Sequence, residues 1–309
     1  MDFLRYLESI RTSFGENLFY YLTYGGEEIM LLAIVCILFW CVNKKTAYRI
    51  VFAYMPAILV INTLKISLKI ERPWVRDPSF TAVEKAKASA TGYSFPSGHT
   101  QCAVSLWGTL GLKTKKMLPK ILFFALIPLV MLSRMYLGVH TPADVLASFA
   151  VSAVIAVVVN LVIDRLELTR KRRFIIMSFL TGLGILYVIY TFILLNTGRL
   201  TYADASDGCK GAAAGIAFAI GWYVESVHVR FDTRCKYIRQ QILKAVIGIG
   251  GTLAIRSGIK ALFEANIFID MIRYFLMMSW AMMVMPIIIK HFFEVRENGP
   301  ADVKAEGND

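Results

Sequence analysis

The sequence is poor in charged residues. Asp, Glu, Lys and Arg make up 18% of its 309 residues, whereas a typical soluble domain has about a quarter. Hydrophobic residues make up 57%, and many of them form long apolar runs. Runs of roughly 20 such residues are typical of membrane-spanning helices. The composition therefore excludes an ordinary soluble domain and predicts an all-α, polytopic membrane protein.

Acidic residues are fewer than basic ones, 22 against 34, which gives a net charge of +12. A strongly basic chain can indicate nucleic-acid binding, but here the basic residues fall in short loops between apolar runs. That distribution is typical of the cytoplasmic loops of membrane proteins. We therefore expect a bilayer as the partner of this chain and no nucleic acid.

Paired cysteines are also missing. The five cysteines include no C-x-x-C pair and lie mostly in apolar runs, at Cys36, Cys41, Cys102, Cys209 and Cys235. This pattern favours small core residues over a zinc site or a disulfide framework. The first 22 residues lack the basic-then-apolar order of a cleavable signal, and no internal repeat of fixed period is present.

The first 22 residues have the pattern of an amphipathic helix. Their apolar residues recur at helical spacing, at Phe3, Leu7, Ile10, Phe14, Leu18 and Leu22. Charged residues lie between them, so we expect one helix lying along the membrane surface.

Nine apolar segments follow and are predicted to span the membrane. Their ranges are 27–42, 47–69, 97–112, 120–137, 142–163, 174–195, 211–227, 241–263 and 271–290. The predicted parts of the chain are an interfacial helix (1–22), a six-span core (23–195), three additional spans (196–291) and a polar cytoplasmic tail (292–309).

The loops between these segments alternate in charge. The basic loops contain Lys44, Lys45, Arg49, Lys113, Lys115, Lys116, Lys120, Arg165, Arg170, Lys171, Arg172, Arg173, Arg230, Arg234, Lys236 and Arg239. With nine spans they all fall on one side, which the positive-inside rule makes cytoplasmic. Residues 70–96, 138–141, 196–210 and 264–270 then face the opposite side, together with the surface helix.

Three short stretches on that opposite side contain residues that an apolar segment rarely includes. In the first, Lys65 and Arg72 are seven residues apart, which places them on one face of a helix that Pro73 ends. Lys69 shares this face. A bland alternative is that these cations only reach outwards to the membrane interface.

The second stretch is Pro96-Ser97-Gly98-His99. Ser97 suits a helix N-cap, and Gly98 allows a ligand to approach the backbone closely. A helix start with free N–H groups attracts anions, and His99 adds a proton donor. The alternative is an ordinary loop-to-helix junction with an exposed histidine.

The third stretch runs from Ser133-Arg134 to His140 and Asp144. Thr141 and Pro142 predict a helix start, which places Asp144 one turn beyond His140. A carboxylate there fixes the tautomer of the imidazole and strengthens its other nitrogen as a base or nucleophile. Alternatively, Asp144 only closes a capping box with Thr141.

All three stretches open on the same face of the predicted bundle, so their side chains can converge. Three cations, a helix start and two imidazoles suit a tetrahedral dianion. No carboxylate cluster that could hold magnesium or zinc lies near them, so we expect chemistry without a metal or other cofactor.

These stretches, Lys65-x6-Arg72-Pro73, Pro96-Ser97-Gly98-His99 and Ser133-Arg134-x5-His140-x3-Asp144, resemble the three-part signature of the type 2 phosphatidic acid phosphatase (PAP2) superfamily. All eleven specified positions match in order. The six-span core of that family would cover residues 27–195. The Gly25-Gly26-Glu27-Glu28 stretch, the turn at residues 40–45 and the additional spans look like the sphingosine-1-phosphate phosphatase branch and its bacterial relatives.

The resemblance implies a lipid phosphate phosphatase. His140 would attack phosphorus to form a phosphohistidine, and His99 would protonate the leaving alcohol and then activate water. The phosphate oxygens would be held by Lys65, Arg72, Arg134, Ser97 and Gly98. Trp74 and Tyr93 could cover the lipid head group or anchor the loop at the interface. Glu27 and Glu28 could recognise an amine or pair with a cation.

Other functions remain open at this point. An isoprenyl pyrophosphate phosphatase or a lipid phosphotransferase could use the same site. A non-catalytic lipid-binding or transport protein has no need of both histidines, and a vanadate-dependent haloperoxidase resembles soluble proteins. The additional spans could form a homodimer or shape a path for lipid. We expect a bacterial plasma membrane with the site on the extracytoplasmic side, the alternative being the endoplasmic reticulum with a lumenal site.

Overall fold

The computed structural model describes residues 1–264 and 266–294. Within these residues every regular element is a helix, as the composition predicts. Among the described residues, seven helical segments are long and apolar enough to cross a membrane: Lys44–Arg76, Met117–Tyr136, Pro142–Arg165, Arg170–Asn196, Tyr202–Val229, Ile238–Leu262 and Ile267–Phe292. The protein is a polytopic helical membrane protein. The predicted polar tail lies outside the described residues from position 295 onwards.

Seven of the nine predicted spans are long apolar helices in the part of the chain that the structure describes. The segments predicted at 27–42 and 97–112 are also helical but shorter. The first consists of α3 (Glu28–Ile37) and the π-helical turn η2 (Leu38–Val42). It becomes an eighth candidate span only together with residues Ser13–Gly26, from which it is bent by 48°.

The other short helix lies inside the bundle. It consists of α7 (Gly98–Ala103), the π-helical turn η3 (Val104–Gly108) and α8 (Thr109–Lys113). At about 1.5 Å per residue it is shorter than the roughly 30 Å of a hydrocarbon core. It packs against α4 (Lys44–Leu68), α9 (Met117–Tyr136) and α10 (Pro142–Arg165).

The helix from Lys44 ends four residues earlier than predicted. Leu68 is the last residue of α4, and Lys69 follows in the left-handed conformation with φ 52°. Lys65 and Arg72 are therefore not on one helix face. Arg72 instead precedes the short helix α5 (Pro73–Arg76), in a loop that also contains α6 (Glu84–Lys87). The ammonium of Lys69 donates to the carbonyl of Arg199, so this side chain is turned away from the predicted site.

The N-terminal segment also differs from its prediction. It forms two helices, α1 (Asp2–Ser9) and α2 (Ser13–Leu22), because Thr12 caps a new helix start by accepting a hydrogen bond from Gly15 N–H at 3.1 Å. A one-turn 3₁₀ helix, η1 (Thr23–Gly26), follows. Leu4 and Leu7 are buried instead of facing lipid. Leu4 packs in a cluster with residues of the loop after α4 and of the α9–α10 connection, including Phe80 and Val139.

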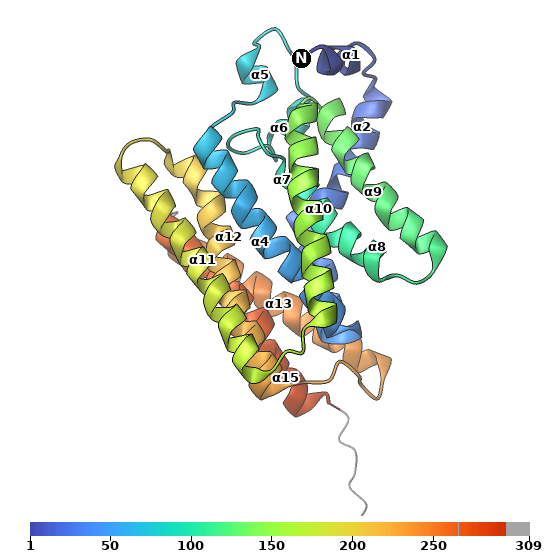
Figure 1. The fold of residues 1–309 in the computed structure, drawn as a ribbon, viewed down its shortest axis with the longest axis vertical. Coiled ribbons are helices and arrows are strands. Elements are labelled where there is room, and N and C mark those ends of the chain that lie inside the picture. Colours follow the sequence, from blue (N-terminus) through green and yellow to red (C-terminus); the bar gives the residue numbers. More distant parts are fainter. Residues whose placement is uncertain (265, 295–309) are drawn as a thin grey trace, which may run out of the picture.

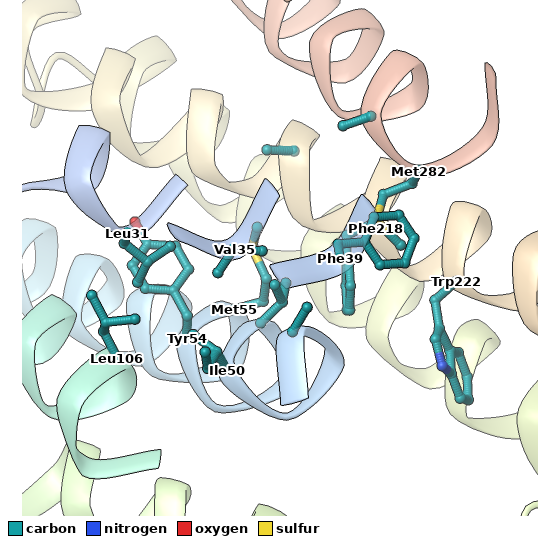
Figure 2. Packing of buried hydrophobic residues seen from close by; sticks show 14 of the residues in the cluster. Leu31, Val35, Phe39, Ile50, Tyr54, Met55, Leu106, Phe218, Trp222 and Met282 are labelled. Atoms are coloured by element: carbon teal, nitrogen blue, oxygen red, sulfur yellow. The ribbon is translucent and has the colours of Figure 1, made fainter. Parts of the chain in front are cut away.

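The C-terminal third packs directly on the rest of the molecule. It contains α11 (Arg170–Asn196), α12 (Tyr202–Val224), η4 (Glu225–Val229), α13 (Ile238–Leu262), α14 (Ile267–Ser279), η5 (Trp280–Val284) and α15 (Met285–Phe292). Figure 2 shows Phe218, Trp222 and Met282 of this part beside Phe39 and Met55 of the first half. The largest apolar core therefore joins both parts. Helix α12 supplies mostly small buried residues, which allow helices to approach closely in a membrane.

Two ends of the bundle are distinct. Helices α1, α2, α5 and α6 gather at one end, and α15 lies at the other (Figure 1). Near that second end, Asp164 pairs with Arg49 at 2.5 Å and also with Lys113. Because these residues come from three separate basic loops, the structure places those loops at a common end, as the alternation of charge predicts.

Candidate active site

Arg72 lies at the centre of the polar site and is fixed there by its loop. Its guanidinium donates to the carbonyls of Thr91 at 2.7 Å, Gly92 at 3.1 Å and Val139 at 3.0 Å. Nη1 is also 3.0 Å from Nε2 of His140. The loop backbone thus aims this cation at the histidine, although Arg72 does not share a helix with Lys65.

His140 and Asp144 take the arrangement that the third stretch predicts. Thr141 is the N-cap of α10 and Pro142 its first residue. Asp144 Oδ2 lies 3.5 Å from His140 Nδ1 and also accepts the Thr141 N–H at 2.7 Å. Both interpretations of Asp144 therefore hold, since one carboxylate oxygen closes the capping box and faces the ring.

His140 is deeply buried beside several cations. The side chain is only 2% exposed. Burial, together with the positive charges of Arg72, Arg134 and Lys65, holds the pKa of His140 well below its usual value. The ring is therefore neutral near pH 7. With Nδ1 facing Asp144, Nε2 carries the lone pair, which lies 3.0 Å from the donor Nη1 of Arg72.

The start of α7 lies beside this pair. Ser97 is the N-cap and accepts a hydrogen bond from Thr100 N–H at 3.4 Å, as predicted. Its own N–H donates to the backbone carbonyl of Asp144 at 3.1 Å, which joins the two helix starts. A side chain at Gly98 would meet no atom within 4 Å. The backbone there is open to a ligand.

His99 faces a carboxylate of its own. Its Nε2 is 3.1 Å from Oε1 of Glu27, which lies at the junction of η1 and α3. The side chains of His99 and Glu27 are 13% and 27% exposed, compared with 2% for His140. The site therefore has a deep end at His140 and a more accessible end at His99.

Two cations of the site have unused hydrogen-bonding capacity. Arg134 is fully buried and donates from Nη1 to Thr23 Oγ1 at 2.9 Å, but its Nε and Nη2 have no partner. Lys65 is half-buried, and within the described residues its ammonium makes no hydrogen bond. Its charge interacts with Arg72, Arg134, Glu28 and Asp207. The buried donors of Arg134 are costly unless a further acceptor, such as a bound anion, satisfies them.

The remaining predicted residues lie around this centre. Trp74 packs its ring against the Arg72 guanidinium, with 6.0 Å between the guanidinium carbon and the ring centroid. Tyr93 packs beside an apolar cluster that includes Ile66. Glu28 accepts a hydrogen bond from Tyr54 at 2.8 Å and contacts neither histidine.

Sequence patterns did not indicate two of the contacts. Ser94 is buried and donates to Asp144 Oδ2 at 2.6 Å, with its Oγ 3.5 Å from the His140 ring. Glu27 was considered only as a ligand for an amine or a partner of a cation. No local pattern reveals either contact, because the partners are 50 and 72 residues apart in the chain. Among residues 1–264 and 266–294, no three His, Cys, Asp or Glu side chains form a group that could hold a metal ion.

Comparison with known families gives two matches along the chain. Residues 46–168 match the model of the PAP2 superfamily. Residues 209–295 match the model described as the transmembrane extension of PAP2 superfamily phosphatases. The first range contains every residue of the three stretches, and the second begins within α12 and includes α13, α14 and α15.

The chain is also similar to individual proteins named as sphingosine-1-phosphate phosphatases. Human sphingosine-1-phosphate phosphatase 2 is 26% identical over 153 residues, which are 46% of this chain and 37% of that protein. Mouse sphingosine-1-phosphate phosphatase 1 is 26% identical over 220 residues, or 69% of this chain and 47% of that protein. The chain thus matches less than half the length of these relatives. The crystal structure of Aquifex aeolicus LpxE superposes with a TM-score of 0.47 and 22% identity, covering 52% of this chain and 93% of that one.

Proposed function

Because the chain belongs to the PAP2 superfamily, we propose that it is a membrane phosphatase that hydrolyses a lipid phosphate monoester through a phosphohistidine. The substrate that we propose first is sphingosine-1-phosphate or a similar lipid phosphate, since the relatives carry that name. His140 is the nucleophile, His99 the general acid and base, and Lys65, Arg72 and Arg134 bind the phosphate oxygens.

The observation that carries this proposal is the unsatisfied guanidinium of Arg134. Its Nε and Nη2 are buried without a partner among the described residues, in a site that also contains Arg72, His140 and the ammonium of Lys65. A buried charged donor without an acceptor costs about 1–3 kcal/mol or more. A phosphate dianion supplies several acceptor oxygens at once, and Arg binds such oxygens in pairs.

The depth of the site supports the division of roles. The deeply buried His140 meets the phosphorus, whereas the more exposed His99 faces the side through which a lipid chain can extend. His140 Nε2 attacks phosphorus while the bond to the lipid oxygen breaks and that oxygen takes the proton of His99. In the second step a water oxygen attacks phosphorus while His99 takes a proton from that water. The P–N bond breaks, and its electron pair returns to His140.

The experiment is phosphate release by the purified protein in detergent with EDTA present. The panel is sphingosine-1-phosphate, phosphatidic acid, phosphatidylglycerol phosphate and undecaprenyl pyrophosphate. Comparison variants are His140→Ala and His291→Ala; His291 is exposed at the far end of the molecule. We expect release from a monoester, a loss of about 10³-fold or more in His140→Ala, and wild-type activity in His291→Ala.

Each result has a distinct meaning. A His140→Ala variant that retains turnover would contradict the phosphohistidine mechanism. Activity that EDTA abolishes would contradict the prediction of metal independence. A phosphoenzyme that forms without release of phosphate would favour the phosphotransferase, and lipid acceptors would then be added.

A further inference from the structure

The junction between η1 and α3 is fitted closely against the helices of the site. Gly26 lies against the carbonyl of His99, and a side-chain carbon placed there would be 2.6 Å from that oxygen. The carbonyl of Gly25 accepts a hydrogen bond from Trp107 Nε1 at 2.6 Å, and Thr23 accepts one from Arg134. These contacts fix the backbone that carries Glu27, so its carboxylate is held 3.1 Å from His99 Nε2.

We propose that Glu27 is a positioning residue for catalysis, which holds His99 by Nε2 and stabilises its protonated form so that Nδ1 delivers the proton to the leaving oxygen. This proposal rests on the proposed function. It gives each histidine its own carboxylate, with Asp144 facing the nucleophile His140 and Glu27 facing the acid His99.

The charges around His99 explain why a carboxylate is needed. Arg134 from α9 and Lys65 from α4 both act on His99, and His140 lies close enough to interact with it. Positive charges disfavour a protonated imidazole, and burial acts in the same direction. Among the groups that act on His99, Glu27 is the one that favours the protonated ring. Burial and the cations together lower the pKa of His99 to about 4, and Glu27 opposes part of that shift.

The protons of His99 can be followed through both half-reactions. The proton of Nδ1 moves to the alkoxide oxygen as its bond to phosphorus breaks. His99 is then neutral, with its remaining proton on Nε2 shared with Glu27. In the second half-reaction Nδ1 accepts a proton from the attacking water, and the starting state is restored. Glu27 itself stays ionised throughout.

The neighbouring carboxylate provides a matched control. Glu28 is the next residue in the chain, but it accepts its hydrogen bond from Tyr54 and does not contact His99. Glu27→Gln and Glu28→Gln therefore make the same chemical change at adjacent positions, and only the first removes a charge from the general acid. Glu27→Asp keeps the charge on a side chain that is one methylene shorter.

The test compares two monoesters in the full-length protein: an alkyl phosphate, whose leaving oxygen needs a proton, and p-nitrophenyl phosphate, whose leaving group does not. For Glu27→Gln we expect kcat to fall roughly 10- to 100-fold with the alkyl phosphate and less than about threefold with p-nitrophenyl phosphate. In the plot of kcat against pH for Glu27→Gln, the fall in kcat at alkaline pH (the alkaline limb) should begin about one pH unit lower than in the wild type. Glu28→Gln removes a charge that acts on Lys65 and so changes the rates on both substrates together; it should keep both the wild-type limb and the wild-type ratio of the two substrates.

Several results would overturn the proposal. One is an equal loss on both substrates with an unchanged pH profile, which indicates a structural role. Another is a Glu28→Gln variant that shifts the limb as Glu27→Gln does. If Glu27→Gln does not fold, Glu27→Asp decides. Its shorter side chain holds His99 less well, so the proposal requires a larger loss with the alkyl phosphate than with p-nitrophenyl phosphate, and an equal loss on both substrates overturns it. A folded wild-type protein inactive on both substrates would instead contradict the proposed function itself.

Discussion

Asp144 serves two structural purposes with one oxygen. Oδ2 accepts hydrogen bonds from Thr141 N–H and Ser94 Oγ and faces the His140 ring. The carboxylate thereby fixes the start of α10 and the orientation of the imidazole together. A change at this residue should therefore affect both stability and rate, and the two effects can be separated.

We predict that Asp144→Asn lowers kcat roughly 10²-fold, because an amide no longer stabilises the charge that develops on His140 during attack. The same change should lower the free energy of unfolding by about 1 kcal/mol through the weakened cap. Both are measured on the purified protein, by phosphate release and by thermal unfolding in detergent.

Asp204→Asn is the matched control for Asp144→Asn. Asp204 occupies the same position in α12, three residues after the N-cap Thr201, and bonds that residue's hydroxyl at 2.6 Å. The Asp204→Asn variant should lose a similar amount of stability and keep a kcat within about twofold of the wild type. If both variants lose rate equally, Asp144 acts only as a cap.

At the scale of elements, helix α1 holds the loop that positions Arg72. Arg5 pairs with Asp77 at 2.7 Å, and Glu8 accepts the N–H of Thr81 at 2.8 Å. Leu4 is fully buried below these contacts. The helix predicted to lie on the bilayer thus supports the loop over the site, because its apolar residues meet those of the loop.

We predict that Leu4→Ala destabilises this end of the molecule by about 3 kcal/mol, as is typical of a buried leucine. The midpoint of thermal unfolding in detergent should fall accordingly. Tyr6→Ala on the same helix is the control, since Tyr6 is 60% exposed. Equal midpoints for the two variants would show that α1 does not pack on the loop.

Helix α12 supports the same loop from the opposite side. Thr91, whose carbonyl binds Arg72, donates its hydroxyl to Asp207 of α12 at 2.7 Å. This hydrogen bond to a charged group links α12 to the loop that carries Arg72, a proposed phosphate-binding residue.

Removing that bond should loosen Arg72. We predict that Thr91→Val raises the KM for a phosphate monoester about tenfold, the equivalent of one such hydrogen bond, with a smaller effect on kcat. Thr114→Val, in the loop between α8 and α9, has no such bond and should match the wild type. A Thr91→Val variant with the wild-type KM would show that α12 has no influence on the site.

At the scale of the whole molecule, the basic loops and the proposed active site lie at opposite ends. The basic loops meet through pairs such as Arg49 with Asp164 and Lys44 with Glu225, the latter at 2.8 Å. The helices that cover the site lie at the other end (Figure 1). Because basic loops stay in the cytoplasm, we propose that the site faces away from it.

Cysteine labelling tests this orientation. In a variant without the five native cysteines, we expect an impermeant maleimide to label Glu84→Cys in intact bacterial cells. Lys115→Cys should react only after permeabilisation. Glu84 and Lys115 are both exposed, and they lie in α6 and in a basic loop. The opposite pattern would place the site in the cytoplasm.

The sequence by itself determined the local geometry of the proposed site. Ser97 and Thr141 are N-caps because their side chains satisfy local N–H groups, and the spacing of His140 and Asp144 within one turn follows from helix geometry. The apolar segments determined the class of fold for a similar reason, since burial in a bilayer requires them. All these features depend on residues close together in the chain.

Only the tertiary structure decided which distant groups meet. The end of α4 at Leu68, the burial of Leu4, and the contacts of Ser94 with Asp144 and Glu27 with His99 all depend on partners brought together by folding. A glutamate that follows two glycines has no pattern that distinguishes a ligand for an amine from a partner of histidine. The difference lies in which helix packs against it, and that is settled by contacts across the whole bundle.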